Sequence, residues 1–197
     1  MLVTVLALAV ACGISPYATV ALIGLMHRLG WIAGLPPALA GLSNAWVITL
    51  AVVLVAVEFA ATLVPGIASA WEAAHALLRP PAAIAMALLL SWGGDPGLVL
   101  ATALLAGGIA FGTSLTKLGA RLAIDTSPEP VSNGAANVTE LTGVALISAF
   151  VWRHPVASAA IALAIVVVTA IVVRTVWGMI WRTVVRSRRP GVSGIRS

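Results

Sequence analysis

The ionisable residues that could carry chemistry are few in this chain, and several lie inside long apolar stretches. Glu58 is surrounded by Val, Ala, Phe and Leu, and Glu140 stands at the start of another apolar stretch. An ionised carboxylate in hydrocarbon is costly unless a cation or water compensates it, so each of the two is a candidate for proton coupling or substrate binding. The alternative is a protonated acid that hydrogen-bonds a neighbouring helix and serves packing alone.

Three further polar residues follow a helical spacing. Glu72, His75 and Arg79 would share one face of a helix. That face forms either a buried polar network or a hydrated segment at the membrane surface. The Glu-x-x-His spacing also occurs in carboxylate-bridged metal bundles, but those need a second such motif and more carboxylates. We therefore predict no metal site, no cofactor and no catalytic residue.

Two cations one helical turn apart form another candidate site. Lys117 and Arg121 repel each other unless they share an anion or are compensated by Asp125, and a polar loop with Glu129 and Asn133 follows. A phosphate or carboxylate ligand would suit the pair. Anchoring at the cytoplasmic surface is the alternative, since Lys and Arg accumulate on that side.

Glycine and proline interrupt two of the apolar stretches. Gly13, Ser15 and Pro16 would end one helix and begin another, because serine caps helices and proline is tolerated at the first helical position. Gly108 and Gly112 offer a similar weak point. Two helix N-termini that met there would favour an anion. The alternative is a kink or close helix packing without any ligand.

The composition indicates a membrane protein. Of 197 residues, 61% are hydrophobic and 9% are charged, whereas about a quarter of residues are charged in soluble domains. The basic charge is concentrated after residue 181, which favours a cytoplasmic tail and argues against nucleic-acid binding. Cys12 is the single cysteine, so a disulfide framework within one chain is excluded.

Turn-forming residues divide the chain into six apolar segments, each near the length that crosses a bilayer. They are residues 2–28, 44–63, 66–91, 97–122, 134–152 and 155–181. We expect an all-α polytopic protein with one transmembrane domain over 1–181 and a basic tail over 182–197. An even number of crossings would place both termini in the cytoplasm. Residues 2–28 and 97–122 could instead re-enter at their glycine breaks.

The two halves of the chain resemble each other weakly. With a shift of 89 positions, Ser43-Asn44 coincides with Ser132-Asn133, and each half reads as a glycine-broken span followed by two further spans. Three spans per half would make residues 1–92 and 97–181 an inverted repeat, an architecture that recurs in transporters. Chance similarity between two apolar halves is the alternative.

Several strings resemble a known family. Val57-Glu58-Phe59, Trp71-Glu72-Ala-Ala-His75 and, most specifically, Ser127-Pro-Glu-Pro-Val-Ser-Asn133 are similar to the bacterial membrane proteins catalogued as domain of unknown function 4126. The resemblance covers roughly residues 10–170, but Leu63-Val64 stands where that family often carries an acidic and a basic residue. It implies a multi-span protein of the bacterial inner membrane and supplies no substrate.

These features favour a small carrier or permease for an anionic or amphipathic solute, such as a lipid-linked phosphate. Its coupling carboxylates would be Glu58 and Glu140. A membrane scaffold subunit and a membrane enzyme acting on a lipid headgroup, with Glu72 or His75 as base and Arg79 binding phosphate, are the alternatives. Membrane lipid is the expected partner, and a homo-oligomer is compatible with the sequence.

Overall fold

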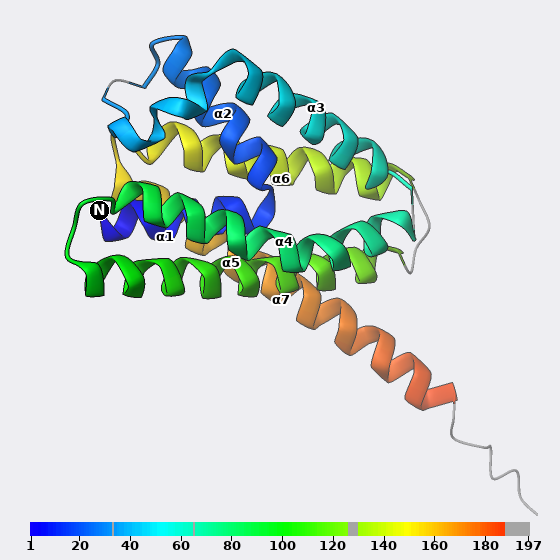
Figure 1. Cartoon of the computed structure of the whole chain (residues 1–197). Helices are drawn as coiled ribbons and strands as arrows, with labels where there is room; N and C mark the ends of the chain where they lie inside the picture. Colours follow the sequence, from blue (N-terminus) through cyan, green and yellow to red (C-terminus); the bar gives the residue numbers. More distant parts are fainter. Residues whose placement is uncertain (33, 65, 126–129, 188–197) are drawn as a thin grey trace, which may run out of the picture.

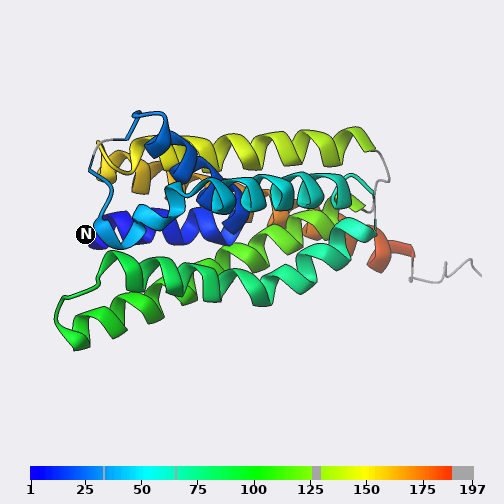
Figure 2. The ribbon, with the colours of Figure 1, turned by 45° about the horizontal axis from the view of Figure 1, so that its top comes forward.

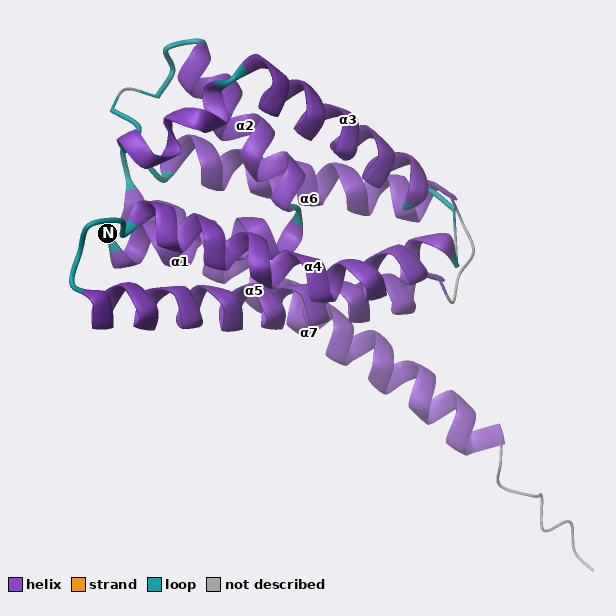
Figure 3. Ribbon diagram, viewed as in Figure 1, coloured by secondary structure: helices purple, strands orange, loops and turns teal. Residues whose placement is uncertain are grey.

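The computed structural model of the protein describes residues 1–32, 34–64, 66–125 and 130–187, and its regular structure within these ranges is entirely helical (Figures 1 and 3). The elements are α1 (Leu2–Ile14), α2 (Pro16–Arg28), η1 (Pro37–Ser43), α3 (Ala45–Ala61), α4 (Ile67–Leu90), α5 (Pro96–Asp125), α6 (Pro130–Phe150) and α7 (Pro155–Ser187). The all-α class expected from the sequence is confirmed.

Two described helices, α4 and α5, are long and apolar enough to cross a membrane by themselves. A third candidate span results if η1 and α3, which are bent by 65° relative to each other, count as one. Length and composition thus identify fewer spans than the six expected from the sequence. One reason is that α1 and α2 contain only 13 residues each and α3 contains 17. Two to three of the described helices could thus span a membrane, which fits a helical membrane protein.

The helices lie side by side, and their connections gather at two ends of the bundle (Figures 1 and 2). The start of α1 and the loops after α2, α4 and α6 lie at one end, which we term the N-terminal end. At the opposite end, α3 and α5 finish and α4 and α6 begin, and the amide of Gly66 donates to the Asp125 carboxylate there at 3.1 Å. We term this the α7 end, because α7 extends beyond it.

Residues 2–28 form two short helices that fold back on each other. α1 enters from the N-terminal end and stops at Ile14, and α2 returns toward the same end (Figure 2). Ser15 adopts an extended backbone, as a residue before proline prefers, and its hydroxyl accepts a hydrogen bond from the Ala18 amide at 3.2 Å. Pro16 occupies the first position of α2. The turn therefore lies inside the bundle.

The second expected break is absent, because α5 is one continuous helix through Gly108 and Gly112. Both glycines have open space where a Cβ would stand. Without water in the surroundings, a glycine in a membrane helix has no alternative partner for its backbone groups, so the helical hydrogen bonds persist. Gly107, in contrast, packs closely against α4, because a Cβ at this position would lie 2.8 Å from the Ile84 side chain.

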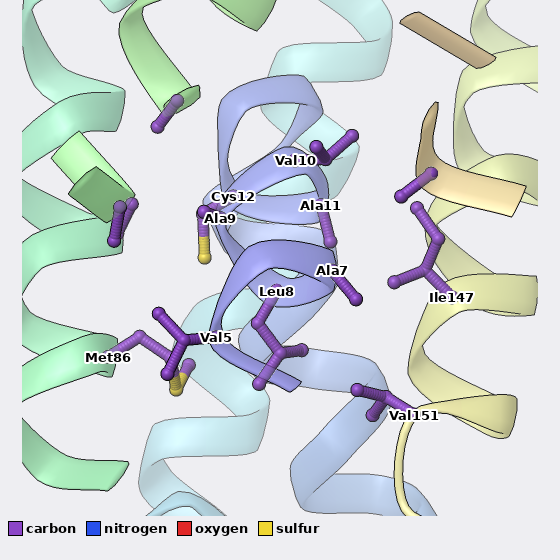
Figure 4. Close-up of a cluster of buried hydrophobic side chains, with 14 of the residues drawn as sticks. Val5, Ala7, Leu8, Ala9, Val10, Ala11, Cys12, Met86, Ile147 and Val151 are labelled. Atoms are coloured by element: carbon purple, nitrogen blue, oxygen red, sulfur yellow. The ribbon is translucent and has the colours of Figure 1, made fainter. Parts of the chain in front are cut away.

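An apolar core fills the bundle near the N-terminal end. Figure 4 shows α1 surrounded by buried side chains, with Val5 and Leu8 facing Met86 of α4 and Val151 after α6. Val5, Leu8 and Val151 are each only 1% exposed. The buried side chains of this half are mainly apolar, whereas the buried charged residues gather toward the α7 end.

The turn after α1 depends on close contact with α5. A Cβ on Gly13 would lie 2.7 Å from the Cβ of Thr113 and 2.9 Å from the Ala110 carbonyl oxygen. We predict that Gly13→Ala lowers the stability by about 1–3 kcal/mol, the usual cost of overpacking. Gly108→Ala is the control and should be neutral or slightly stabilising. Detergent-solubilised protein unfolded with increasing denaturant gives both values, and equal stability of the two variants would contradict the packing described.

Candidate functional site

Six ionisable side chains from four helices meet in the interior, closer to the α7 end, and we term them the ion network. They are Glu58 of α3, Glu72 and Arg79 of α4, Lys117 and Arg121 of α5, and Glu140 of α6. All six were site candidates in the sequence. Three carboxylates face three cations, so the network is neutral when every member is ionised.

Arg79 joins the two carboxylates of α3 and α4. Its Nη2 lies 2.9 Å from Glu58 Oε1 and its Nη1 lies 2.5 Å from Glu72 Oε2, and its side chain is fully buried. A guanidinium suits this role because its planar fork presents several donors in fixed directions. Glu72 is therefore part of a buried network and not of a hydrated surface segment.

Lys117 is shared by all three carboxylates. Its Nζ lies 3.0 Å from Glu72 Oε1, 3.0 Å from Glu140 Oε2 and 3.5 Å from Glu58 Oε1. Arg121 Nη2 lies 2.9 Å from the same Glu140 oxygen. The anion that the two neighbouring cations require is thus Glu140, contributed by another helix. Lys117 connects the Arg79 side of the network to the Arg121 side.

The turn between α1 and α2 contacts the ion network directly. Ser15 is the N-cap of α2, and its hydroxyl donates to Glu58 Oε2 at 2.5 Å. On the other side of the turn, Lys117 Nζ donates to the Ile14 carbonyl at 2.9 Å and the Ser114 hydroxyl donates to the Gly13 carbonyl at 3.1 Å. A carboxylate thus faces a helix N-terminus and a cation faces a helix C-terminus, which is the favourable polarity for both.

Two asparagines of α6 complete the site at Arg121. Asn133 Oδ1 accepts from Arg121 Nη1 at 3.2 Å, and Asn137 Oδ1 accepts from Nη2. Asn137 also donates to the Phe59 carbonyl at 3.2 Å. The sequence analysis did not select Asn137, although its position one turn after Asn133 places both amides on one helix face. Ser114 was also not among the selected site residues, because its Ser-x-x-Lys spacing with Lys117 lacks the companion motifs of acylating serine enzymes.

Asp125 lies outside the ion network. Its carboxylate accepts hydrogen bonds from the Ser69 hydroxyl and from the Gly66 amide and so joins the end of α5 to the start of α4. It does not pair with Lys117 or Arg121, because its oxygens accept hydrogen bonds from Gly66, Ser69 and the Asn133 amide instead. Glu129, another candidate of the sequence analysis, lies outside the described residues.

His75 belongs to a separate aromatic cluster. Its ring stacks on Trp71 with the centroids 4.3 Å apart, and its Nε2 lies 3.2 Å from the Tyr17 hydroxyl. Its Nδ1 lies 2.9 Å from the Trp71 carbonyl oxygen. Both ring nitrogens therefore have partners away from the carboxylates. Among the described residues, no group of three His, Cys, Asp or Glu side chains is arranged to hold a metal ion.

The three carboxylates differ in their access to the outside of the bundle. The side chain of Glu72 is 0% exposed, that of Glu58 is 9% exposed and that of Glu140 is 24% exposed. Between α3 and α6, a cavity of about 30 Å³ reaches Glu58, Lys117 and Glu140. A second cavity of about 100 Å³ reaches Lys117 and Glu140 from the side of α7. Glu140 is thus the most accessible of the three carboxylates, and Lys117 lines the same two cavities.

The ion network predicts a characteristic mutational pattern. Arg79→Met removes one cation and leaves a buried excess negative charge, so we expect a loss of about 3–5 kcal/mol in the free energy of unfolding. The double variant Arg79→Met/Glu72→Leu restores charge balance and should be more stable than the single variant. Unfolding of the purified variants measures both. A double variant that is less stable than Arg79→Met would show that the two side chains are not coupled in this way.

Comparison with known proteins agrees with the resemblance noted in the sequence. The model of the family described as "Domain of unknown function (DUF4126)" matches residues 2–175, a range that contains the whole ion network and the turn at Ser15. No curated protein and no solved structure matches the chain significantly. Because the match spans most of the sequence, the chain belongs to the DUF4126 family.

Proposed function

We propose that this protein is a proton-linked carrier for an anionic or amphipathic solute, with Lys117 and Glu140 as the exchange pair. The observation that supports this most directly is the position of Lys117, whose Nζ lies 3.5 Å or less from three carboxylates and beside the end of a broken helix. A cation held by three anions can release one of them and still be held in place by the other two.

Charge balance links the protonation of Glu140 to the binding of the anion. With all six side chains ionised, the ion network is neutral; protonation of Glu140 leaves it with one positive charge in excess. An anionic group that takes the place of the Glu140 carboxylate beside Lys117 and Arg121 restores neutrality. Because an uncompensated charge is costly in a low-dielectric interior, the proton and the anion bind together. The carrier therefore moves one proton with each singly charged anion.

The accessible member of the network is also the exchangeable one. Glu140 lines both cavities and has the most exposed side chain of the three carboxylates. Glu72 and Glu58 are held by Arg79, and Glu58 is further held by Ser15. These two carboxylates keep Lys117 and the helix turn in position while Glu140 changes its protonation state.

Five helices cross the bilayer in the proposed topology, and α1 and α2 form a re-entrant hairpin. Each of α3 to α7 runs from one end of the bundle to the other (Figure 1). The basic residues after position 181 favour a cytoplasmic location for the α7 end. The start of α1 then lies outside the cytoplasm, in contrast to the cytoplasmic location of both termini expected from six crossings. Family membership and the positive-inside rule together support the bacterial inner membrane.

The proposal includes an inverted relation between the two halves of the chain, limited to the last two helices of each half. The pairs α3–α4 and α6–α7 run in opposite directions through the bundle, as inverted repeats require (Figure 1). The first elements differ, since residues 2–28 turn back at Ser15 whereas α5 is continuous. The two halves therefore differ in their first elements, and the broken helix belongs to the first half alone.

Labelling of single cysteines tests this topology. In a Cys12→Ala background, we expect Leu2→Cys and Gly94→Cys to react with an impermeant reagent on intact cells, because both lie at the N-terminal end. Val131→Cys, at the α7 end, should react only after permeabilisation. Reaction of Leu2→Cys only after permeabilisation, with Gly94→Cys reactive from outside, would instead support six crossings.

Transport measurements test the function. The full-length protein in proteoliposomes should take up labelled inorganic phosphate or a fluorescent alkyl phosphate when a proton gradient is imposed. We expect anion binding by the unmodified protein to strengthen as the pH falls, because protonation of Glu140 removes its negative charge from beside Lys117 and Arg121. Glu140→Gln carries a permanently neutral side chain, so its anion binding should be independent of pH and its transport should no longer respond to the proton gradient.

Asp95→Asn is the matched control, since Asp95 is an exposed carboxylate far from the network and asparagine can replace it as a helix cap. Its transport should respond to pH as in the unmodified protein. Failure of the protein to move either phosphate probe, together with an unchanged pH response in Glu140→Gln, would refute the proposed function.

A further inference from the structure

A groove between α1, α5 and α7 leads along the bundle to the ion network. Its apolar part has a volume of about 410 Å³ and is lined by residues such as Leu6, Ile109, Gly112 and Leu163. It adjoins the cavity of about 100 Å³ that contains Lys117 and Glu140, since both are lined by Thr113 and Val166. An apolar cavity thus lies directly beside the cavity that contains the charged pair.

The groove is long enough for part of an acyl chain. From Ile109 to Lys117, α5 advances by about 12 Å, given a rise of about 1.5 Å per residue. The charged part lies toward the α7 end and the apolar part toward the N-terminal end. A lipid of the leaflet at the α7 end has the same orientation, with its head near the surface and its chain directed to the bilayer centre.

The polar cavity also has a defined hydrogen-bonding character. Four threonines line it, and each hydroxyl donates to a carbonyl of its own helix: Thr113 to Ile109, Thr116 to Gly112, Thr139 to Ala135 and Thr169 to Ile165, at distances of 2.8 to 2.9 Å. A hydroxyl that has donated its hydrogen retains only acceptor lone pairs. The cavity therefore offers acceptors from the threonines and from Glu140, and a cation from Lys117.

We propose that this groove binds a single-chain lipid phosphate whose head carries hydroxyl groups, as a lysophospholipid does. The phosphate pairs with Lys117, the hydroxyls donate to the threonines and Glu140, and the chain occupies the apolar part. The volume of about 100 Å³ is several times the roughly 10–15 Å³ that a water molecule needs, so a head of several atoms fits. The inference deepens the proposed function and depends on it for the anion-binding role of Lys117.

Selectivity must come from the head. Inside a bilayer an apolar groove offers a lipid chain little advantage over the surrounding lipid, since the chains are as apolar as leucine. The Lys117–Glu140 pair and the threonine oxygens, in contrast, offer polar partners that the hydrocarbon lacks. A fatty acid or a prenyl monophosphate supplies an anion without head hydroxyls, so both should bind less tightly than a lysophospholipid of comparable chain length.

Native mass spectrometry of the full-length protein titrated with lysophosphatidylglycerol tests the inference. Gly112→Leu adds a side chain to the groove at a position with open space for a Cβ, and we expect its affinity for the lipid to fall about tenfold or more. Gly108→Leu is the matched control, since Gly108 also has open space but does not line the groove. Its affinity should remain within about twofold of the unmodified protein.

A second variant tests recognition of the lipid head without altering the apolar part of the groove. Thr169→Val is nearly isosteric and removes one acceptor, so binding of lysophosphatidylglycerol should weaken about three- to tenfold while binding of a fatty acid stays the same. Equal effects of the two glycine variants, or tighter binding of the fatty acid or prenyl phosphate than of lysophosphatidylglycerol, would overturn the inference. Neither result bears on the proton-linked transport of the phosphate probes, which the transport assay tests separately.

Discussion

A charge buried in a low-dielectric bundle must lie against an opposite charge, and this requirement organises the interior of the protein. Arg79, Lys117 and Arg121 have no aqueous surroundings to compensate them, so they hold three carboxylates from α3, α4 and α6. The packing of α3 and α6 near α4 and α5 is therefore coupled to charge balance. A change in the charge of one member affects four helices at once.

The broken helix is stabilised by the same charges. Two helix ends inside a membrane protein leave backbone groups that hydrocarbon cannot satisfy. Here Lys117 and Ser114 donate to the last carbonyls of α1, while Ser15 caps α2 and donates to Glu58. The ends of α1 and α2 and the ion network thus compensate each other. In the function we propose, this arrangement holds Lys117 in place while Glu140 exchanges with an anion.

The separation of the apolar core from the ion network has a consequence for access. Near the N-terminal end, the described side chains packed around α1 are mainly aliphatic (Figure 4). The cavities that reach Lys117 and Glu140 open between helices, at α3 and α6 and beside α7. Lateral access of this kind suits a ligand that is itself dissolved in the membrane.

The sequence by itself determined the helical class, the membrane environment and the residues that need partners. Glu58, Arg79 and Lys117 stand out because their apolar surroundings make an isolated charge too costly. Helical spacing also indicated that Glu72 and Arg79 share a face. Only the tertiary structure decided that Glu140, not Asp125, lies between Lys117 and Arg121, that Asn137 accepts from Arg121, and that residues 2–28 turn back while α5 continues. Periodicity defines the faces of one helix, but the neighbour of each face depends on how the whole set of helices packs.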